Sequence, residues 1–361
     1  MAIVLGLWAA AWLPQALAQG ASQGAPQFKV DPFWPKPLPG NWILGQVAGI
    51  AVDRDDNIWI IHRPGTIVDD EKEGMKNPPT TKCCTPAPPV LKFDRAGNLL
   101  ANWGGPGAGY DWPKSEHGIM VDSGGSVWIA GNDPADHQII KFTGDGKFLQ
   151  QIGHANSTGG SNSTTQLGRP AHMMLDEKAG ELYVADGYKN HRVIVFDART
   201  GAYKRHWGAY GKPPSDDKQA VYSPTGQQPQ FNNPVHCVRM SHDGLLYVCD
   251  RGNDRIQIFK PDGSFVKEYK VAPETLAGGS LWDLVLSEDP AQRYMFVADG
   301  SNDQIHILLR ESGQEIGAFG RPGRMAGEFK WVHNMAIDSQ GNLYTSEVGT
   351  GRRAQKFLRQ K

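Results

Sequence analysis

Short apolar runs alternate with turn-forming residues along the chain, and one phrase of this pattern recurs six times. Each copy joins an apolar strand to a turn with Asp, Gly or Asn, followed by a strand of the type Leu/Ile-Tyr/Trp-Val/Ile. The copies are GIAVDRDDNIWII, GIMVDSGGSVWIA, MMLDEKAGELYVAD, CVRMSHDGLLYVCD, LVLSEDPAQRYMFVAD and NMAIDSQGNLYTSE. The pattern therefore predicts a series of antiparallel hairpins.

Further strands follow every hairpin. A third strand such as VLKFD or VIVFD comes after each copy, and five copies add a fourth that often ends in Trp-Gly or Phe-Gly. Four-stranded units that recur every 40 to 50 residues or so are typical of propeller blades, because one such sheet cannot bury both faces without neighbours. We therefore predict an all-β fold, a six-bladed β-propeller with NHL-like repeats.

The sixth copy ends after its third strand, at AQKFLRQK. Residues 27–33 (QFKVDPF) alternate like a strand, and an open sheet edge is a liability that folds avoid. We expect this N-terminal strand to complete the sixth blade and close the ring, so that residues 27–361 form one domain. Residues 64–89 and 208–234 are expected to be long blade insertions, either lids or surface loops.

The first twenty residues contain an apolar run followed by Ala16-Leu17-Ala18, the small-residue pattern of a signal-peptidase site. We predict that residues 1–18 are a signal peptide and that the protein is secreted or periplasmic, with no membrane span after signal removal. The formal net charge of -1 provides no broad positive field. We therefore expect no nucleic acid or anionic membrane as a partner.

The four cysteines of an exported chain can form disulfides. Cys237 and Cys249 flank the turn SHDG at nearly matching distances and can face each other across a hairpin. Cys83 and Cys84 are adjacent in a Pro-rich segment, where a vicinal disulfide, separate partners and free thiols all remain open. No pair of cysteines has the spacing of a structural zinc site.

Equivalent first-strand positions of the six copies carry Ala48, His117, His172, His236, Trp282 and His333. The first strand of a blade lines the axis of a propeller, so these side chains are expected to form a ring around one channel. Three neutral imidazoles that meet at one point suit Zn²⁺ and leave a coordination position for water or substrate. The alternative is that each histidine forms hydrogen bonds only within its own blade.

A second set of side chains follows the second strand of the blades, where the chain turns toward the mouth. Arg63, Tyr188 and Arg251 depart from the repeat consensus and are the functional candidates here. Two guanidinium groups can clamp a carboxylate, and a phenol beside a metal and cations can act as a base. Surface ion pairs and an ordinary aromatic are the alternative. Recurring aspartates just before them are expected to brace turns: Asp186, Asp250 and Asp299.

At these positions the chain resembles the peptidyl-α-hydroxyglycine α-amidating lyases, relatives of NHL-repeat propellers, from about Gly45 to Phe357. The matching phrases are GQVAGIAVD with IIHR, EHGIMVD, VADGYKNHR, NPVHCV, VCDRGNDRIQIF and VHNMAID. The resemblance implies a catalytic zinc ion held by three histidines: His117, His236 and His333. It also implies that Tyr188 is the base and that Arg63 and Arg251 position the substrate.

The resemblance further implies a calcium ion at the axis, bound by the backbone carbonyls of Ile50 and Ile119 and by the side chain of Asn334. The family has a carboxylate where Asn334 stands, and an amide should bind calcium more weakly. His172 replaces an acidic residue of the animal members, and Trp331 replaces a methionine beside the active site. Together with Trp282, these two residues are candidates for additional contacts in the pocket.

These observations predict a zinc-dependent carbon–nitrogen lyase that splits an α-hydroxyglycine carbinolamide into an amide and glyoxylate. The expected substrate is a small molecule or peptide with a carboxylate. Two alternatives remain: a non-catalytic NHL-repeat binding module, and another propeller enzyme such as a metal-dependent lactonase.

Overall fold

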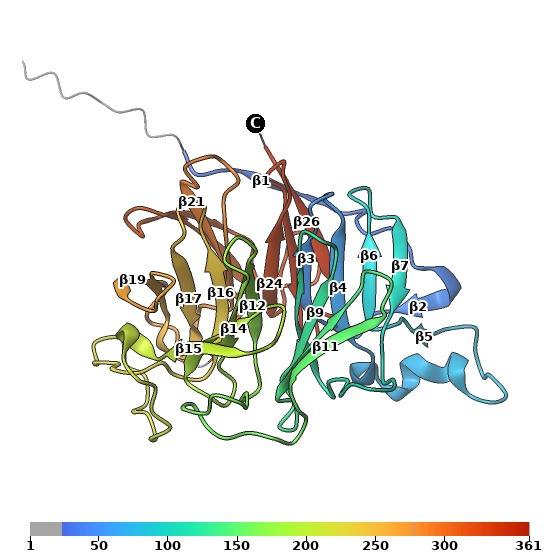
Figure 1. Cartoon of the computed structure of the whole chain (residues 1–361). Coiled ribbons are helices and arrows are strands. Elements are labelled where there is room, and N and C mark those ends of the chain that lie inside the picture. The colour runs from blue at the N-terminus through green and yellow to red at the C-terminus, as the bar shows by residue number, and fades with distance from the viewer. Residues whose placement is uncertain (1–23, 277, 361) are drawn as a thin grey trace, which may run out of the picture.

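A computed structural model describes residues 24–276 and 278–360. The chain forms a six-bladed β-propeller, in which six four-stranded antiparallel sheets surround a common axis (Figure 1). The predicted signal peptide, residues 1–18, lies outside the described residues. No helix in the described part of the chain is long and apolar enough to cross a membrane.

The blades follow one another in sequence, each running from its inner to its outer strand. Blade 1 contains β3 (Gln46–Val52), β4 (Ile58–Arg63), β6 (Val90–Phe93) and β7 (Leu99–Trp103). Blade 2 contains β8 (Glu116–Val121), β9 (Val127–Gly131), β10 (Gln138–Phe142) and β11 (Phe148–Gly153). Blade 3 contains β12 (His172–Asp176), β13 (Glu181–Asp186), β14 (Arg192–Asp197) and β15 (Tyr203–Trp207).

The second half repeats the arrangement. Blade 4 contains β16 (Val235–Met240), β17 (Leu246–Asp250), β18 (Arg255–Phe259) and β19 (Phe265–Lys270). Blade 5 contains β20 (Asp283–Leu286), β21 (Tyr294–Asp299), β22 (Gln304–Leu309) and β23 (Glu315–Phe319). Blade 6 contains β24 (Val332–Ile337), β25 (Leu343–Glu347), β26 (Ala354–Arg359) and β1 (Phe28–Asp31).

The N-terminal strand closes the ring, as predicted. Strand β1 pairs antiparallel with β26, with Phe28 opposite Arg359 and Asp31 opposite Lys356. The six inner strands also contact one another in a closed circle, because β3 touches both β8 and β24. The last sheet is thus completed from both ends of the described chain, and the ring has no unpaired break at that point.

The hairpin turns repeat one arrangement of hydrogen bonds that explains the recurring Asp and Tyr/Trp positions. In blade 1, Asp53 Oδ1 accepts the backbone N–H groups of Asp55 (3.0 Å) and Asn57 (2.9 Å). Its Oδ2 accepts the indole N–H of Trp59 at 2.9 Å. The same link joins Asp122 to Trp128 and Asp338 to Tyr344. These aspartates stabilise the turns between the first two strands of the blades.

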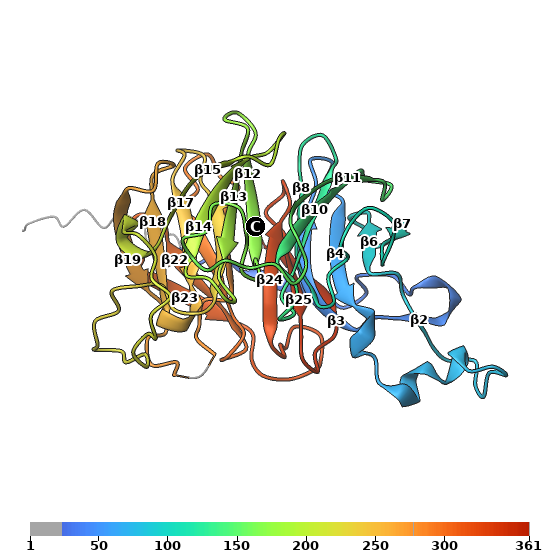
Figure 2. The same ribbon diagram turned by 60° about the horizontal axis from the view of Figure 1, so that its bottom comes forward.

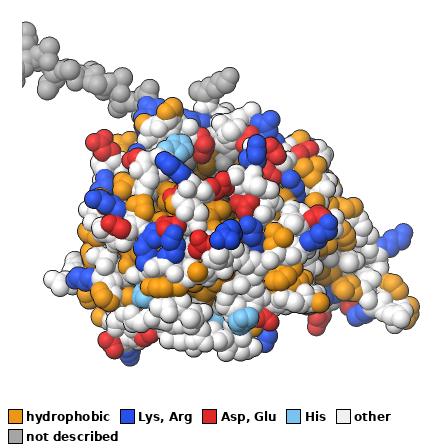
Figure 3. All heavy atoms as spheres, viewed as in Figure 1, with side chains coloured by type: hydrophobic (Ala, Val, Ile, Leu, Met, Phe, Trp, Pro, Cys, Tyr) orange, Lys and Arg blue, Asp and Glu red, His pale blue; other side chains and the backbone are white. Residues whose placement is uncertain are grey.

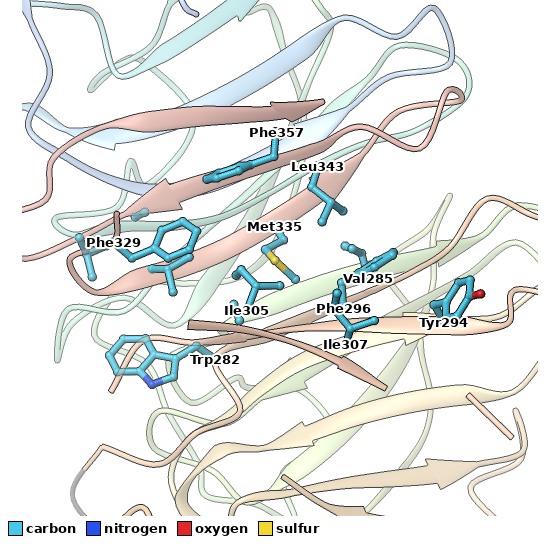
Figure 4. Packing of buried hydrophobic residues seen from close by; sticks show 14 residues of the cluster. Trp282, Val285, Tyr294, Phe296, Ile305, Ile307, Phe329, Met335, Leu343 and Phe357 are labelled. Carbon is cyan, nitrogen blue, oxygen red and sulfur yellow. The ribbon is translucent and has the colours of Figure 1, made fainter. Parts of the chain in front are cut away.

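The core lies between neighbouring blades, where the apolar faces of two sheets pack together. Figure 4 shows the cluster between blades 5 and 6, in which Phe296 and Ile307 face Met335 and Leu343. All four side chains are almost fully buried. Since each sheet buries both faces in this way, the inner strands are fixed on all sides and can hold side chains toward the axis in defined positions.

Both predicted insertions lie at the same end of the molecule (Figures 1 and 2). The first contains the 3₁₀ helices η2 (Pro64–Thr66) and η3 (Asp69–Met75) and the short strand β5 (Thr85–Pro86), which pairs in parallel with β2 (Trp42–Ile43). The second contains η4 (Ala209–Gly211). The remaining 3₁₀ helices are η1 (Pro39–Asn41) and η5 (Arg251–Asn253).

Each cysteine lies at disulfide distance from another. Cys237 on β16 stands opposite Cys249 on β17 in the pairing register, and their sulfur atoms are 2.02 Å apart. Cys83 and Cys84 in the first insertion are also paired with each other, the vicinal arrangement among the three left open by the sequence. Acidic and basic side chains are interspersed on the face seen in Figure 3, in keeping with the small net charge.

Candidate metal centre and active site

Three histidines meet at one end of the propeller axis. His117, His236 and His333 are each the second residue of an inner strand, β8, β16 and β24 respectively. Their ring centroids are 4.6 to 5.1 Å apart, and one nitrogen from each ring lies within 4.8 Å of the others. All three are buried. The spacing suits a single ion held by three imidazoles.

A break in strand pairing accompanies each of the three histidines. The register shifts between Val235 and Cys237, and again between Val332 and Asn334, so the intervening histidine has no cross-strand partner. A similar shift spans His117 in blade 2. Such bulges redirect a side chain that regular alternation would send elsewhere. Local irregularity at the start of the inner strands therefore turns these imidazoles toward the axis.

The second nitrogen of each imidazole contacts a main-chain carbonyl of another blade. Nδ1 of His117 lies 2.8 Å from the oxygen of Ala171, and Nδ1 of His333 lies 2.7 Å from that of Ala48. Nδ1 of His236 contacts the oxygen of Trp282. A carbonyl only accepts, so each Nδ1 carries the proton and each Nε2 keeps its lone pair. Fixing the tautomer in this way is typical of metal-ligating histidines.

Burial keeps these rings neutral. Burial first, and then the charges of the nearby Arg63 and Arg251, lower the pKa of His333 to about 3. The pKa values of His117 and His236 are also well below the usual range, first because of burial and then because His333 is close by. Neutral imidazoles with a free Nε2 are the form that binds a metal ion, so these residues fit a metal group.

Tyr188, the predicted base, lies directly beside the histidines. Its hydroxyl oxygen is 2.9 Å from Nε2 of His117 and 3.0 Å from Nε2 of His236. The side chain is partly exposed, and it follows β13 in the loop that leads to β14. The hydroxyl is thus within reach both of the imidazole nitrogens and of a molecule entering from solvent.

The two predicted arginines flank the same point. Arg63 ends β4, and its side chain donates to the carbonyl of Glu116 (2.7 Å) and to the side-chain oxygens of Gln46 (2.8 Å) and Asn132 (3.1 Å). Arg251 follows β17, and its guanidinium carbon lies 5.9 Å from the ring centroid of Tyr188. The Nε of Arg251 is buried without a hydrogen-bond partner. A donor in that state is available to a ligand.

Two tryptophans continue the site on the side of Arg251. Trp282 stacks against the Arg251 guanidinium, with 4.1 Å between guanidinium carbon and ring centroid, and its own ring lies 5.6 Å from that of His333. Trp331 is 6.3 Å from Trp282 and 45% exposed. Of the two predicted pocket residues, Trp282 therefore borders the three histidines, and Trp331 lies next to Trp282 at the surface.

His172 does not join the other histidines. The backbone N–H of Ala171 donates to Ala185, which also stands opposite His172, so Ala171 occupies the ring position in blade 3. The alignment of His172 with the metal-binding positions is thus displaced by one residue. Instead its imidazole lies near the charges of Arg239 and Asp283, and its pKa is lowered to about 3 by burial and then by Arg239.

The side chain expected to bind calcium is engaged elsewhere. The amide of Asn334 donates to Asp283 (3.1 Å) and its oxygen contacts Nδ1 of His333 (3.0 Å). The buried Asp283 carboxylate already accepts Arg239 Nη2 at 2.6 Å and the N–H of Met335 at 3.0 Å. A calcium site needs several free oxygens with net negative charge. Asn334, which the prediction grouped with Ile50 and Ile119, does not offer a free oxygen, because its amide oxygen contacts His333. The positive charge beside Asp283 comes from Arg239.

Sequence reasoning missed Arg169, which precedes β12. Its Nε and Nη2 donate to the carbonyl of Asn132, the residue whose side chain accepts Arg63. Its guanidinium lies 5.6 Å from the ring centroid of Tyr188. A signal existed, because the segment LGRPAH before β12 carries a charged residue next to its proline, whereas the segment FNNPVH before β16 carries amides there. The rule that singled out Arg63, departure from the repeat consensus, applies equally to Arg169.

Among the described residues, one further group has metal-ligand spacing: Cys237, Cys249 and Asp283. The two sulfurs lie within disulfide distance of each other, so they are not thiolate ligands. The predicted turn aspartates are structural as well. Asp186 and Asp250 are fully buried. They accept the backbone N–H groups of Gly168 and Asn232, in the loops before β12 and β16, and the side chains of Arg192 and Arg255 respectively.

Comparison with known proteins supports the resemblance. Peptidylglycine alpha-amidating monooxygenase of Rattus norvegicus is 26% identical over 323 residues, which are 86% of this chain and 30% of the rat protein. Peptidyl-alpha-hydroxyglycine alpha-amidating lyase 1 of Drosophila melanogaster is 27% identical over 347 residues, 90% of this chain and 58% of the fly protein. NHL repeat-containing protein 3 of Mus musculus is 24% identical over 352 residues, 92% and 84% of the two chains.

These relatives, together with others at 22% to 28% identity, confirm the predicted similarity to amidating lyases and NHL-repeat proteins. The chain spans less than a third of the rat monooxygenase. No family model matches it.

Solved structures agree on the fold. A streptogramin B lyase superposes with a TM-score of 0.52 at 12% identity, covering 92% of this chain and 98% of the lyase. A protein of unknown function from Bacteroides thetaiotaomicron gives a TM-score of 0.56 at 14% identity, with 88% and 70% covered. At this level of identity the likeness concerns the propeller architecture alone.

Proposed function

We propose that this chain is a zinc-dependent lyase that cleaves the C–N bond of an α-hydroxyglycine carbinolamide, giving an amide and glyoxylate. The single observation that carries the proposal is the convergence of three neutral imidazoles, two of which contact the hydroxyl of Tyr188, in a site that Arg63 and Arg251 flank. The amidating names of the fly and rat relatives favour this reaction over others that a three-histidine site can support.

The arginines position the substrate. Arg63 is held by three neutral oxygens, and Arg251 has a free Nε beside Tyr188, so both can turn N–H groups to a carboxylate that enters between them. Charge-assisted hydrogen bonds from two guanidinium groups fix both the place and the orientation of such a group. The substrate is accordingly a small molecule or peptide that ends in an α-hydroxyglycine carboxylate.

Tyr188 moves the proton. In its ionised form the phenolic oxygen takes the proton of the substrate hydroxyl while the C–N bond breaks and the C–O bond becomes the carbonyl of glyoxylate. The electron pair of the broken bond stays on the amide nitrogen, and the return of the proton from Tyr188 to this nitrogen gives the free amide. Zinc held at His117, His236 and His333 would polarise the hydroxyl oxygen and stabilise charge on it. The balance needs no oxidant or reductant.

Export of the protein to the periplasm or medium is part of the proposal. It rests on the Ala16-Leu17-Ala18 pattern and on two pairs of cysteines at disulfide distance, which are rare in reducing compartments. The test is N-terminal sequencing of the protein recovered from each cell fraction. A mature chain that begins at Gln19 supports export.

The function is tested by elemental analysis and by turnover of N-benzoyl-α-hydroxyglycine, with glyoxylate release as readout. We expect about one zinc per chain, lost in His333→Ala and kept in the matched control His242→Ala, whose histidine is exposed in the turn before β17. Zinc-loaded protein that releases no glyoxylate from any α-hydroxyglycine substrate would refute the lyase.

The two other functions predict different results in the same experiments. A binding module of the kind suggested by NHL repeat-containing protein 3 would show no bound metal and no turnover. A lactonase would hydrolyse lactones, and its activity would rise when calcium is added.

A further inference from the structure

The mouth around Tyr188 carries three guanidinium groups rather than two. Arg169 and Arg251 lie on the Tyr188 ring, at 5.6 and 5.9 Å from its centroid, and Arg63 shares Asn132 with Arg169. None of the three forms an ion pair with a carboxylate of the described residues. The hydrogen bonds of Arg63 and Arg169 go to neutral oxygens, so no carboxylate of the described residues pairs directly with these charges.

Two carboxylates, Glu116 and Asp136, attract Arg63 without forming an ion pair with it. Glu116 accepts the indole N–H of Trp112 at 2.9 Å, and burial raises its pKa. Asp136 accepts the backbone N–H groups of Lys114 (2.9 Å) and Ser115 (3.0 Å). Both groups are thus occupied in holding loops. Like charges repel, and an anionic ligand bound between the guanidinium groups would offset them by direct contact.

Arg169 is held in place at a cost to the backbone. Its φ of +62° lies in the left-handed region, which side chains other than Gly, Asn and Asp rarely adopt. The conformation persists because the Arg169 carbonyl accepts the backbone N–H of Tyr188 at 3.2 Å and the side chain binds Asn132. Strained residues of this kind cluster where a ligand is held. The strain and the unpaired charge are independent observations at one residue.

We infer that the substrate carries a second carboxylate, in addition to that of its α-hydroxyglycine end, and that Arg169 binds it. The inference rests on the proposed function, which assigns the first carboxylate to Arg63 and Arg251. The planar fork of Arg169 can form two parallel hydrogen bonds to a carboxylate, and its neighbour Tyr188 places this group next to the scissile bond. The substrate class is therefore an N-acyl-α-hydroxyglycine whose acyl group comes from a dicarboxylic acid.

The test compares the binding of non-reactive analogues by calorimetry. The monoanion is N-benzoylglycine, and the dianions are its three derivatives that carry one carboxylate at the ortho, meta or para position of the benzoyl ring. We expect at least one dianion to bind the purified protein about tenfold to a hundredfold more tightly than the monoanion, as a charge-assisted contact predicts. In Arg169→Gln this ratio should fall to about threefold or less.

Two further variants keep the test sharp. Arg169→Gly removes the guanidinium and also suits the positive φ, so a loss of preference in both variants cannot come from misfolding alone. Arg54→Gln removes an exposed arginine in the β3–β4 turn and should leave the preference unchanged. Equal binding of the monoanion and every dianion by the unaltered protein, or a preference that survives in both Arg169 variants, would overturn the inference.

Calorimetry does not require turnover, so the two proposals fail separately. Preference for a dianion without glyoxylate release would refute the lyase and keep the second anionic subsite. Release of glyoxylate from N-benzoyl-α-hydroxyglycine, without preference for a dianion, would keep the lyase and remove the role of Arg169.

Discussion

Lowering the pH from 7 to 5 should leave the zinc affinity of the three-histidine site almost unchanged. An imidazole must be neutral to bind the metal, so protons normally compete with zinc below the histidine pKa. Here burial and the Nδ1–carbonyl contacts keep the rings neutral, and the pKa of His333 is about 3. The free protein therefore enters the binding step already in the competent form at both pH values.

The size of the contrast follows from the titration. For a histidine of ordinary pKa, about 6.5, the protonated form exceeds the neutral form about 30-fold at pH 5. Three such ligands would therefore weaken zinc binding by a factor of roughly 10⁴. An imidazole with a pKa of about 3 is only about 1% protonated at pH 5, so the loss of zinc affinity per ligand is about 1%. The pKa values of His117 and His236 are lowered in the same direction.

The assay is a competition with a fluorescent zinc chelator calibrated separately at pH 7, 6 and 5, with a hexahistidine peptide as the reference for ordinary imidazoles. We expect the dissociation constant of the protein to stay within a factor of about three while that of the peptide rises steeply. A rise of a thousandfold or more for the protein would show that the rings titrate normally, and it would refute both the burial argument and the fixed tautomer.

The same lowered pKa values affect folding, because below about pH 6.5 the histidines of the unfolded chain bind protons that the buried rings of the folded protein do not. The free energy of unfolding of the metal-free protein should therefore fall as the pH is lowered from about 6.5 toward the folded pKa values, and urea titrations at each pH would measure it. Tyr188→Phe should keep zinc and the fold but lose turnover by a factor of about 10² to 10⁴, and unchanged glyoxylate release would remove the base assignment. Arg239→Met leaves the buried Asp283 carboxylate without its charged partner and should lower the free energy of unfolding by about 3–5 kcal/mol. A calcium chelator should leave the melting temperature of the unaltered protein unchanged. Replacing Cys237 and Cys249 together by Ala should cost about 2–4 kcal/mol in urea unfolding and remove any effect of reducing agent on this hairpin.

The Arg239–Asp283 pair changes the picture drawn from the resemblance. Asn334 occupies the position of a calcium-binding carboxylate, yet it bridges Asp283 and His333 instead. A guanidinium delivers positive charge without an exchangeable ion, and its planar fork meets both oxygens of Asp283. The sequence alone does not predict this pair. Arg239 is one residue of an inner strand, and no local pattern indicates that it contacts Asp283, which is 44 residues away.

Much of the candidate site was predictable because the fold repeats. Once six copies are aligned, four histidines fall at equivalent positions, three of which converge in the structure, and departures from the consensus single out Tyr188 and Arg251. Repetition converts positions far apart in the chain into neighbours around an axis, which local patterns cannot do in a fold without repeats. Arg169 lies in the loop before β12, outside the repeated strands, so the alignment of the strands does not single it out.

The sequence by itself determined the blades and the closing strand and supplied four candidate histidines for the axis, because period-two alternation and turn chemistry act locally and recur in each copy. Only the tertiary structure decided which histidines converge. His172 is one residue out of register, and a shift of one residue in a strand redirects a side chain completely. The tautomers of the three metal-facing rings were likewise decided by carbonyls of neighbouring blades, which approach only when the ring is closed.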